Sequence, residues 1–324
     1  MMINKANRET FLDSVCAIMI IYMIYGHICL WCGIKQVEIF QRILFFFMPW
    51  FFFKSGMFFR EEPVRQTLLK GIKRLVVPYI IFSIIGQFVF WIMWILQGRE
   101  VNIDYILSPL RTLLHEGAVV GNSPLWFLFT LFLVRLIFII IYKRTKKIVM
   151  VITFLSVVVP FVLCLNKFHD FYYISNVCSG LFFYIMGFYL KDKQYEMKYM
   201  VLGLLFYLLY AIYYPSYFDF RSNQINPSFY ILCFLSCIGG IIVYNNIFKR
   251  LFSNFKILEY IGRNSMSYYV LHWIVLGVMS ILFKYILNFE DGYLLFSIYL
   301  ISNILLLPLL DVYISKKFKW VIGK

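Results

Sequence analysis

Residues 11–32 read FLDSVCAIMIIYMIYGHICLWC, an apolar run in which Asp13 is the one charged residue and His27 the one histidine. A run of about 18 or more apolar residues with few charges is typical of a helix that crosses a membrane. The rest of the chain continues this pattern, because 62% of all residues are hydrophobic and only 15% are charged. Soluble domains are nearer to about 45–50% apolar. The sequence therefore predicts an all-α, polytopic membrane protein.

Similar apolar stretches follow the first one along the chain. Together they predict about ten membrane-spanning helices, at 11–33, 40–59, 75–96, 124–142, 148–165, 173–190, 199–214, 229–247, 265–283 and 293–314. These helices take up most of the 324 residues and leave no room for a soluble domain of about 100 residues. Residues 1–324 are therefore predicted to form a single integral-membrane domain.

Basic residues are unevenly distributed among the connections between these predicted helices. The net charge is +15, and alternate connections carry most of it: Arg60, Arg65, Lys70, Lys73 and Arg74; Lys143, Arg144, Lys146 and Lys147; Lys191, Lys193 and Lys198; Lys249, Arg250, Lys256 and Arg263; Lys316, Lys317, Lys319 and Lys324. Cytoplasmic connections of membrane proteins are enriched in Lys and Arg. The pattern predicts a multi-pass protein of the cell membrane with both termini, including Lys5 and Arg8, in the cytoplasm. Because topology and contact with membrane lipids explain the basic charge, we expect no nucleic-acid binding.

The N-terminal run and the cysteines add no other function. The first apolar run is too long for a signal peptide and is predicted to be a retained helix. The seven cysteines all lie in or at the ends of apolar runs, where cysteine behaves as a small hydrophobic residue. Cys29 and Cys32 have CxxC spacing, but no second pair or adjacent histidine completes a ligand set. We therefore expect no metal site.

His27 and His272 both lie inside predicted membrane-spanning helices. An ionisable residue at this depth costs about 2.5–3.5 kcal/mol on insertion scales, so it is a functional candidate. Asp13 lies on the same helical stripe as His27, ~21 Å away along the axis. The stripe would suit an enzyme that joins a cytoplasmic donor to an external acceptor. The alternative is that each histidine only bonds to a neighbouring helix and fixes its packing.

Several cations and one tryptophan are further candidates. Lys54 is four to six residues from the predicted cytoplasmic end of its helix, and the connection after it is rich in Arg and Lys, which suit phosphates. The alternative is that Lys54 extends to the headgroups and that the connection only sets topology. Arg135 lies in mid-span and needs a partner or a ligand phosphate. Trp126 begins a helix and either stacks on a sugar or belongs to the interfacial aromatic belt.

Two further features concern the shape of the chain. Pro49 is expected to bend the helix 40–59. The long polar external connections 97–123 and 215–228 either cap a site or are solvated connectors.

Six segments in order carry a resemblance to a known family: Arg8 to Asp13 with Gly26-His27, Met48-Pro49 to Lys54-Ser55-Gly56, Lys73-Arg74 with Pro78-Tyr79, Pro124 to Leu128, Gly187 to Leu190, and Ile261 to Ser265 with Tyr269 to His272. At these intervals they resemble the integral-membrane acyltransferases of acyltransferase family 3, which include bacterial polysaccharide and cell-wall O-acetyltransferases. One position departs from the pattern. Many members have Arg or Lys eleven residues before the first-helix histidine, where this chain has Cys16. Lys54 is the candidate to replace that cation.

The resemblance implies transfer of an acyl group, most simply acetyl, from cytoplasmic acyl-CoA to a hydroxyl of an envelope glycan or a lipid-linked sugar. It implies that His27 is the base or an acyl carrier, that His272 is a second catalytic candidate, and that Asp13 organises the cytoplasmic side. The residues expected to bind acetyl-CoA are Lys73, Arg74, Lys70, Lys54 and Ser55. The residues expected to bind the acceptor are Trp126, Ser265 and Arg135.

Two other classes of function fit the same sequence features. An exporter or flippase for a polysaccharide or a lipid-linked sugar would also have many helices with buried charges, although the two halves show no paired Gly- or Pro-broken helices. A membrane scaffold would need neither histidine for more than stability. Consumption of acyl-CoA distinguishes the enzyme from the exporter, and replacement of His27 distinguishes it from the scaffold.

Overall fold

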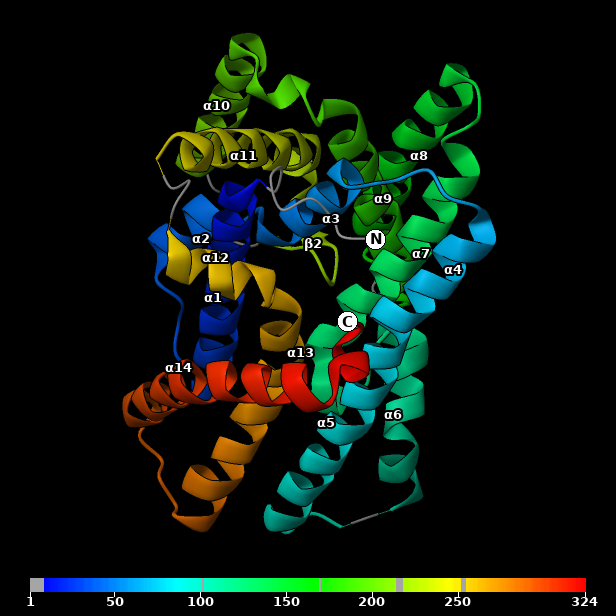
Figure 1. The fold of residues 1–324 in the computed structure, drawn as a ribbon. Helices are drawn as coiled ribbons and strands as arrows, with labels where there is room; N and C mark the ends of the chain where they lie inside the picture. Colours follow the sequence, from blue (N-terminus) through cyan, green and yellow to red (C-terminus); the bar gives the residue numbers. More distant parts are fainter. Residues whose placement is uncertain (1–8, 101, 169, 214–217, 252–254) are drawn as a thin grey trace.

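The computed structural model describes residues 9–100, 102–168, 170–213, 218–251 and 255–324, so Lys5 and Arg8 lie outside the described residues. The fold is all-α with one short hairpin, as the sequence predicts (Figure 1). The helices and strands are α1 (Thr10–Cys32), α2 (Glu38–Leu44), α3 (Phe47–Met57), α4 (Val64–Gly71), α5 (Val77–Leu96), α6 (Ile103–Glu116), α7 (Trp126–Ile141), α8 (Lys146–Leu165), α9 (Tyr172–Leu190), α10 (Met197–Ile212), β1 (Phe218–Asp219), β2 (Gln224–Ile225), α11 (Tyr230–Leu251), α12 (Lys256–Arg263), α13 (Ser265–Met279) and α14 (Gly292–Lys317).

Eight helical stretches in the described part of the chain are long and apolar enough to cross a membrane. Many of their large apolar side chains point outward, such as Ile84 on α5, Phe154 on α8 and Leu305 on α14. Such exposure would be unfavourable in water and is favourable against lipid tails. The structure therefore confirms a multi-pass membrane architecture, while the count of ten spans and the side on which the termini lie stay predictions.

One of the ten predicted spans is interrupted in the structure, whereas the short span predicted at 199–214 has the expected length. It corresponds to α10, which also has 16 residues. Residues 40–59 were predicted as one helix bent at Pro49, and this is wrong, because the chain breaks at Phe45 and Phe46 into α2 and α3. Pro49 is the third residue of α3, where its missing N–H has no helical acceptor to lose. The proline therefore helps to begin a helix instead of bending one.

The connection 97–123, predicted to be a polar loop, contains α6 (Figure 1). Asn102 caps this helix, since its side chain accepts a hydrogen bond from the backbone N–H of Tyr105 at 2.8 Å. One face of α6 is apolar and exposed, with Ile103, Ile106 and Leu110 along it. Three charged residues of this connection lie before α6 and at its two ends: Arg99 precedes the helix, Asp104 is in its first turn and Glu116 is its last residue.

The helix α3 lies in the interior and packs tightly on α9 through glycines. A Cβ atom on Gly56 would lie 2.0 Å from the backbone oxygen of Tyr184, and one on Gly187 would lie 2.0 Å from the backbone oxygen of Phe53. The two backbones therefore approach as closely as small-residue helix pairs allow. This fixes the position of α3, and with it the side chains at both of its ends.

We expect Gly56→Ala to destabilise the protein by about 3 kcal/mol, because the new methyl group must push α3 away from α9. The measurement is thermal unfolding of the detergent-solubilised protein, followed by size-exclusion chromatography. Gly33→Asn is the matched control, since Gly33 has a φ of 65° with no atom near its missing Cβ, and Asn tolerates that conformation. Equal melting temperatures for Gly56→Ala and wild type would contradict the close packing.

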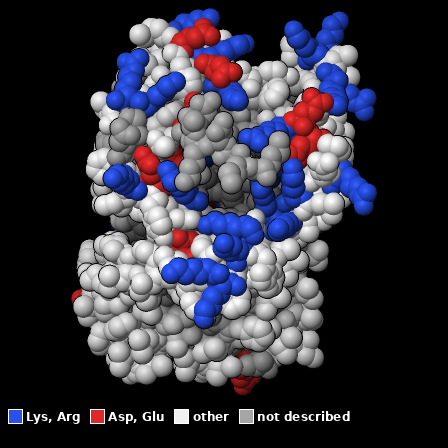
Figure 2. Space-filling model, viewed as in Figure 1, with Lys and Arg blue, Asp and Glu red and all other residues white. Residues whose placement is uncertain are grey.

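Charged side chains are segregated over the molecular surface. In Figure 2, Lys and Arg gather over the upper and central parts of this face, and the lower part carries very few. Such a separation agrees with the uneven distribution of basic residues in the sequence. The side on which the basic connections lie stays a prediction.

Candidate active site

The two membrane-embedded histidines, 245 positions apart in the sequence, are in direct contact. Nδ1 of His27 on α1 lies 2.8 Å from Nε2 of His272 on α13, and the two rings are stacked with an angle of 9° between their planes. Trp273 packs its ring edge-on against His27, with 5.1 Å between the centroids. The His272 side chain is completely buried, whereas His27 is partly exposed.

The hydrogen bonds of this pair assign the tautomers of both rings. His272 Nδ1 lies 2.7 Å from the backbone oxygen of Tyr269, and a carbonyl can only accept, so this nitrogen carries the proton. In a neutral ring, His272 Nε2 is then an acceptor, and His27 Nδ1 must donate to it. The same reasoning leaves His27 Nε2 without a proton. The pair therefore presents His27 Nε2 as a base.

His27 lines a cavity of about 420 Å³, which we call the histidine cavity. Its wall is rich in aromatic rings: Tyr22, Phe45, Phe47, Trp126, Phe220, Tyr269 and Trp273. The polar side chains on the wall are Gln36, Gln41, Ser123, Asp219 and Arg221. A largely apolar pocket with a few convergent polar groups and a base is the usual form of a small-molecule site.

Two segments from predicted external connections close one side of this cavity. Asn122 anchors the first, since its side-chain amide donates to the backbone oxygens of Phe82 and Val270, each at 3.3 Å. The second is the β1–β2 hairpin, from which Arg221 bonds to Glu116 and to the Ser123 hydroxyl. The histidine cavity is therefore built from α1, α13, the first residues of α3 and α7, and these two predicted external connections.

A second cavity of about 570 Å³ lies among α3, α4, α7 and α9, and we call it the basic cavity. Its basic side chains are Lys54, Arg60, Lys70, Arg74 and Arg135, and its acidic residue is Glu62. Glu62 pairs with Lys70 at 2.5 Å. The remaining cations give the cavity a positive field that suits a phosphorylated ligand.

The two cavities lie at opposite ends of α3. Met48 lines the histidine cavity and Lys54 the basic cavity, and these six residues of helix correspond to about 9 Å along its axis. The helix α7 gives the same order, with Trp126 at the first cavity and Arg135 at the second, about 13 Å apart. On both α3 and α7, one end therefore lies at the cavity that contains His27, and a residue further along the helix lies at the cavity that contains the cations.

The residues predicted to bind acetyl-CoA largely meet in one place. Lys54, Ser55, Lys70 and Arg74 all line the basic cavity. In the described part of the chain, Lys73 does not contribute to its wall. Lys73 and Arg74 are neighbours in a π-helical turn, Ile72–Val76, and neighbouring helical residues point in directions about 100° apart.

The residues predicted to bind the acceptor are separated from one another. Trp126 lines the histidine cavity beside His27, whereas Arg135 lines the basic cavity. Ser265 begins α13, seven residues before His272, and among the described residues it lines neither cavity. Asp13 is also away from both, with its carboxylate 3.5 Å from the Arg263 guanidinium. There α1 crosses α12 so closely that a Cβ atom on Gly262 would lie 1.8 Å from the Asp13 backbone oxygen.

Comparison with known protein families gives one match that covers nearly the whole chain. The profile of an acyltransferase domain, that of acyltransferase family 3, matches residues 9–312. The chain belongs to acyltransferase family 3. Neither a curated protein nor a solved structure matches it significantly. The protein is therefore a membrane acyltransferase, which agrees with the family resemblance of its six segments.

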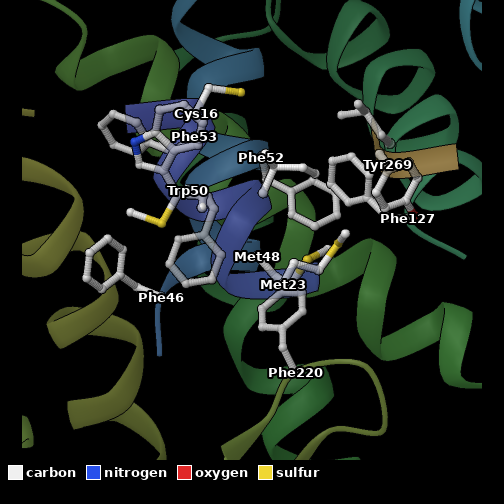
Figure 3. Packing of buried hydrophobic residues seen from close by; sticks show 14 of the residues in the cluster. Cys16, Met23, Phe46, Met48, Trp50, Phe52, Phe53, Phe127, Phe220 and Tyr269 are labelled. Carbon is white, nitrogen blue, oxygen red and sulfur yellow. The ribbon is translucent and has the colours of Figure 1, made fainter. Parts of the chain in front are cut away.

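The departure of this family member at position 16 has a clear structural setting. Cys16 is 2% exposed and belongs to the same buried cluster as Trp50 and Phe53 (Figure 3). Lys54 follows these residues on α3, and its Nζ lies 5.0 Å from the centroid of the Trp50 ring. A cation is therefore present on α3, the helix whose Trp50 and Phe53 share this buried cluster with Cys16.

Sequence reasoning did not identify several residues of the histidine cavity. Asp219 and Arg221 come from a hairpin whose place in the fold no local pattern predicts, and Gln36 and Gln41 flank the break before α3. One feature of the sequence did point to Arg221. The predicted external connections contain few cations, and Arg221 is one of them. That rarity could have marked Arg221 for closer attention.

Proposed function

We propose that this acyltransferase moves an acetyl group from cytoplasmic acyl-CoA to a hydroxyl of an envelope or exported polysaccharide, or of its lipid-linked sugar. The observation that carries the proposal is the His27–His272 pair, which leaves His27 Nε2 as an unprotonated base at the wall of an aromatic cavity. A pair that served only packing would have no need to place one of its histidines at a cavity wall.

The chemistry assigned to His27 is that of a general base. A sugar hydroxyl is a weak nucleophile, so its proton must be removed as the new bond forms. His27 Nε2 takes that proton, the oxygen bonds to the acyl carbon, the carbon–sulfur bond breaks, and the proton passes to the departing thiolate. A two-step version, in which Nε2 first accepts the acyl group and then transfers it, uses the same lone pair.

The donor fits the basic cavity. Coenzyme A carries several phosphate charges, and phosphates are bound by Arg and Lys through short charge-assisted hydrogen bonds. Lys54, Arg74 and Arg135 are the cations that we assign to it, with Ser55 as a neutral donor. Arg135 thereby gains the anionic ligand that a mid-membrane cation requires.

The acceptor fits the histidine cavity. Aromatic faces such as Trp126 suit the apolar faces of sugar rings, while the amides of Gln36 and Gln41 and the Asp219 carboxylate suit hydroxyl groups. Ser123, Asp219 and Arg221 of its wall come from the predicted external connections, where an exported glycan would be found. The donor and the acceptor therefore approach from opposite sides.

We expect Arg135→Ala to weaken coenzyme A binding about 10- to 100-fold, since it removes a charge-assisted hydrogen bond worth about 1.5–3 kcal/mol. The measurement is binding of coenzyme A to the purified protein by isothermal titration calorimetry. Arg99→Ala is the control, because Arg99 lies over the Trp94 ring at the far end of α5 and should leave binding unchanged. Unaltered affinity in Arg135→Ala would remove this residue from the donor site.

The experiment that tests the proposed function is transfer of radiolabelled acetyl from acetyl-CoA into the glycan fraction of membranes. Membranes that contain the protein should incorporate label, and membranes that lack it should not. No incorporation from acetyl-CoA or longer acyl-CoA would overturn the proposal and favour an exporter. Incorporation that is lost on mild alkaline treatment would identify the product as an ester.

A further inference from the structure

The space between the two cavities is filled by aromatic rings. Phe51 and Phe52 lie on the turn of α3 between Met48 and Lys54, and Phe127 lies on the adjacent first turn of α7. The Phe127 ring packs edge-on against both, with centroid distances of 5.8 Å to Phe51 and 4.8 Å to Phe52. Figure 3 shows Phe127 pointing toward Phe52, with Met48 and Met23 close by. Any group that moves between the cavities along this line must pass these rings.

Phe127 also packs against a residue of the histidine cavity. Its ring is 5.9 Å from that of Tyr269, the residue whose backbone oxygen fixes the tautomer of His272. The preceding residue, Trp126, already lines the histidine cavity. Phe127 is therefore the member of the barrier that lies next to the catalytic pair.

Within the barrier, Phe52 is held more firmly than Phe127. A Cβ atom on Gly180 of α9 would lie 2.7 Å from the Phe52 ring, and Gly56 and Gly187 lock the α3 backbone onto α9. Phe52 is completely buried, whereas Phe127 keeps 8% of its surface exposed. Phe127 begins its helix directly after the 3₁₀ turn Val120–Leu125. Phe127 lies on α7, so its replacement leaves the glycine contacts between α3 and α9 unchanged.

We propose that Phe127 sets the size of the acyl group that this enzyme transfers, by closing the route between the basic cavity and the histidine cavity. The inference rests on the proposed function. With the coenzyme A phosphates held by the basic cavity, the thioester must cross about 9 Å of helix to come within reach of His27. The acyl group leads, so it is the part that must pass beside the Phe127 ring. A short chain such as acetyl passes, and each added methylene meets the ring.

The test compares transfer rates from acetyl-CoA, propionyl-CoA and butyryl-CoA in wild type and Phe127→Ala. One methylene in a fitted apolar site changes discrimination about 10-fold or more, so the butyryl-to-acetyl ratio should rise at least about 10-fold in the variant. Phe127→Leu keeps more of the volume and should shift the ratio in the same direction by less. It also provides a reading if Phe127→Ala does not fold.

Phe234→Ala is the matched control, because Phe234 is 2% exposed, contacts three aromatic rings and lies on α11 away from both cavities. Its acyl ratio should equal that of wild type. An unchanged ratio in both Phe127 variants would overturn the proposal, as would an equal shift in Phe234→Ala, since the effect would then be general loosening. Absence of transfer from every acyl-CoA by the wild type is a different result, because it would reject the proposed function itself.

Discussion

Replacement of His27 by alanine should reduce acetyl transfer about 1,000-fold, within the 10²- to 10⁴-fold range that general bases contribute. The imidazole Nε2 at the wall of the histidine cavity is the only lone pair that we assign to proton removal, and alanine supplies none. Loss of the stacked ring should cost less in stability than in activity, since His27 is only partly buried. The rate is measured with radiolabelled acetyl-CoA at saturating donor, on membranes with matched protein levels.

His115→Ala is the control for this change. His115 lies at the end of α6 with nearly half of its side chain exposed and its Nδ1 3.8 Å from the Asp170 carboxylate, so its replacement should leave the rate unchanged. Transfer by His27→Ala at more than one tenth of the wild-type rate would show that another group removes the proton.

Replacement of His272 by alanine should have the second largest effect, a loss of transfer on the order of 100-fold. His272 is completely buried and reaches the cavity only through His27, so we regard it as a positioning residue. Without it, His27 Nδ1–H has no acceptor at 2.8 Å, and the ring is free to turn or to change tautomer. The loss should be smaller than the ~10⁴-fold caused by replacing the orienting carboxylate of a serine-protease triad, because a neutral imidazole contributes no charge.

A positioning role can be separated from simple loss of packing. His272→Gln should recover much of the activity, since its amide oxygen can accept from His27 Nδ1–H while its amide N–H₂ donates to the Tyr269 carbonyl. In both variants the maximal rate should change while the KM for acetyl-CoA stays near its wild-type value, because the basic cavity is distant. A raised KM with an unchanged maximal rate, or Gln no better than Ala, would count against this role.

The parts of the fold that depend on local pattern could be predicted from the sequence. The apolar runs identify most of the long helices, and the family segments contain His27, His272 and three residues of the basic cavity, Lys54, Ser55 and Arg74. Each of these signals lies within about 20 residues of chain. Helix periodicity and membrane hydropathy act over the same distance.

The parts that depend on tertiary packing could not be predicted. No pattern in the sequence indicates that His27 and His272, 245 residues apart, share a hydrogen bond. The interruption between α2 and α3 was missed because Phe45 and Phe46 continue an apolar run, and hydropathy does not distinguish a break from a helix. Arg135 was predicted among the acceptor-binding residues, and as a mid-span cation it was also expected to need a partner or a ligand phosphate. Its place opposite α4 and α9 emerges only when the helices are assembled.

The central claim is that an acyl group passes from a cytoplasmic donor at one end of α3 to an external acceptor at the other. It is tested most directly in sealed inside-out membrane vesicles, whose cytoplasmic face is outermost, with radiolabelled acetyl-CoA supplied outside. We expect labelled glycan inside the vesicles, protected from an added esterase until the membrane is permeabilised, and no label in right-side-out vesicles given the same donor. Label that the esterase removes from intact inside-out vesicles, or transfer in right-side-out vesicles, would show that donor and acceptor react on one side and would contradict the claim.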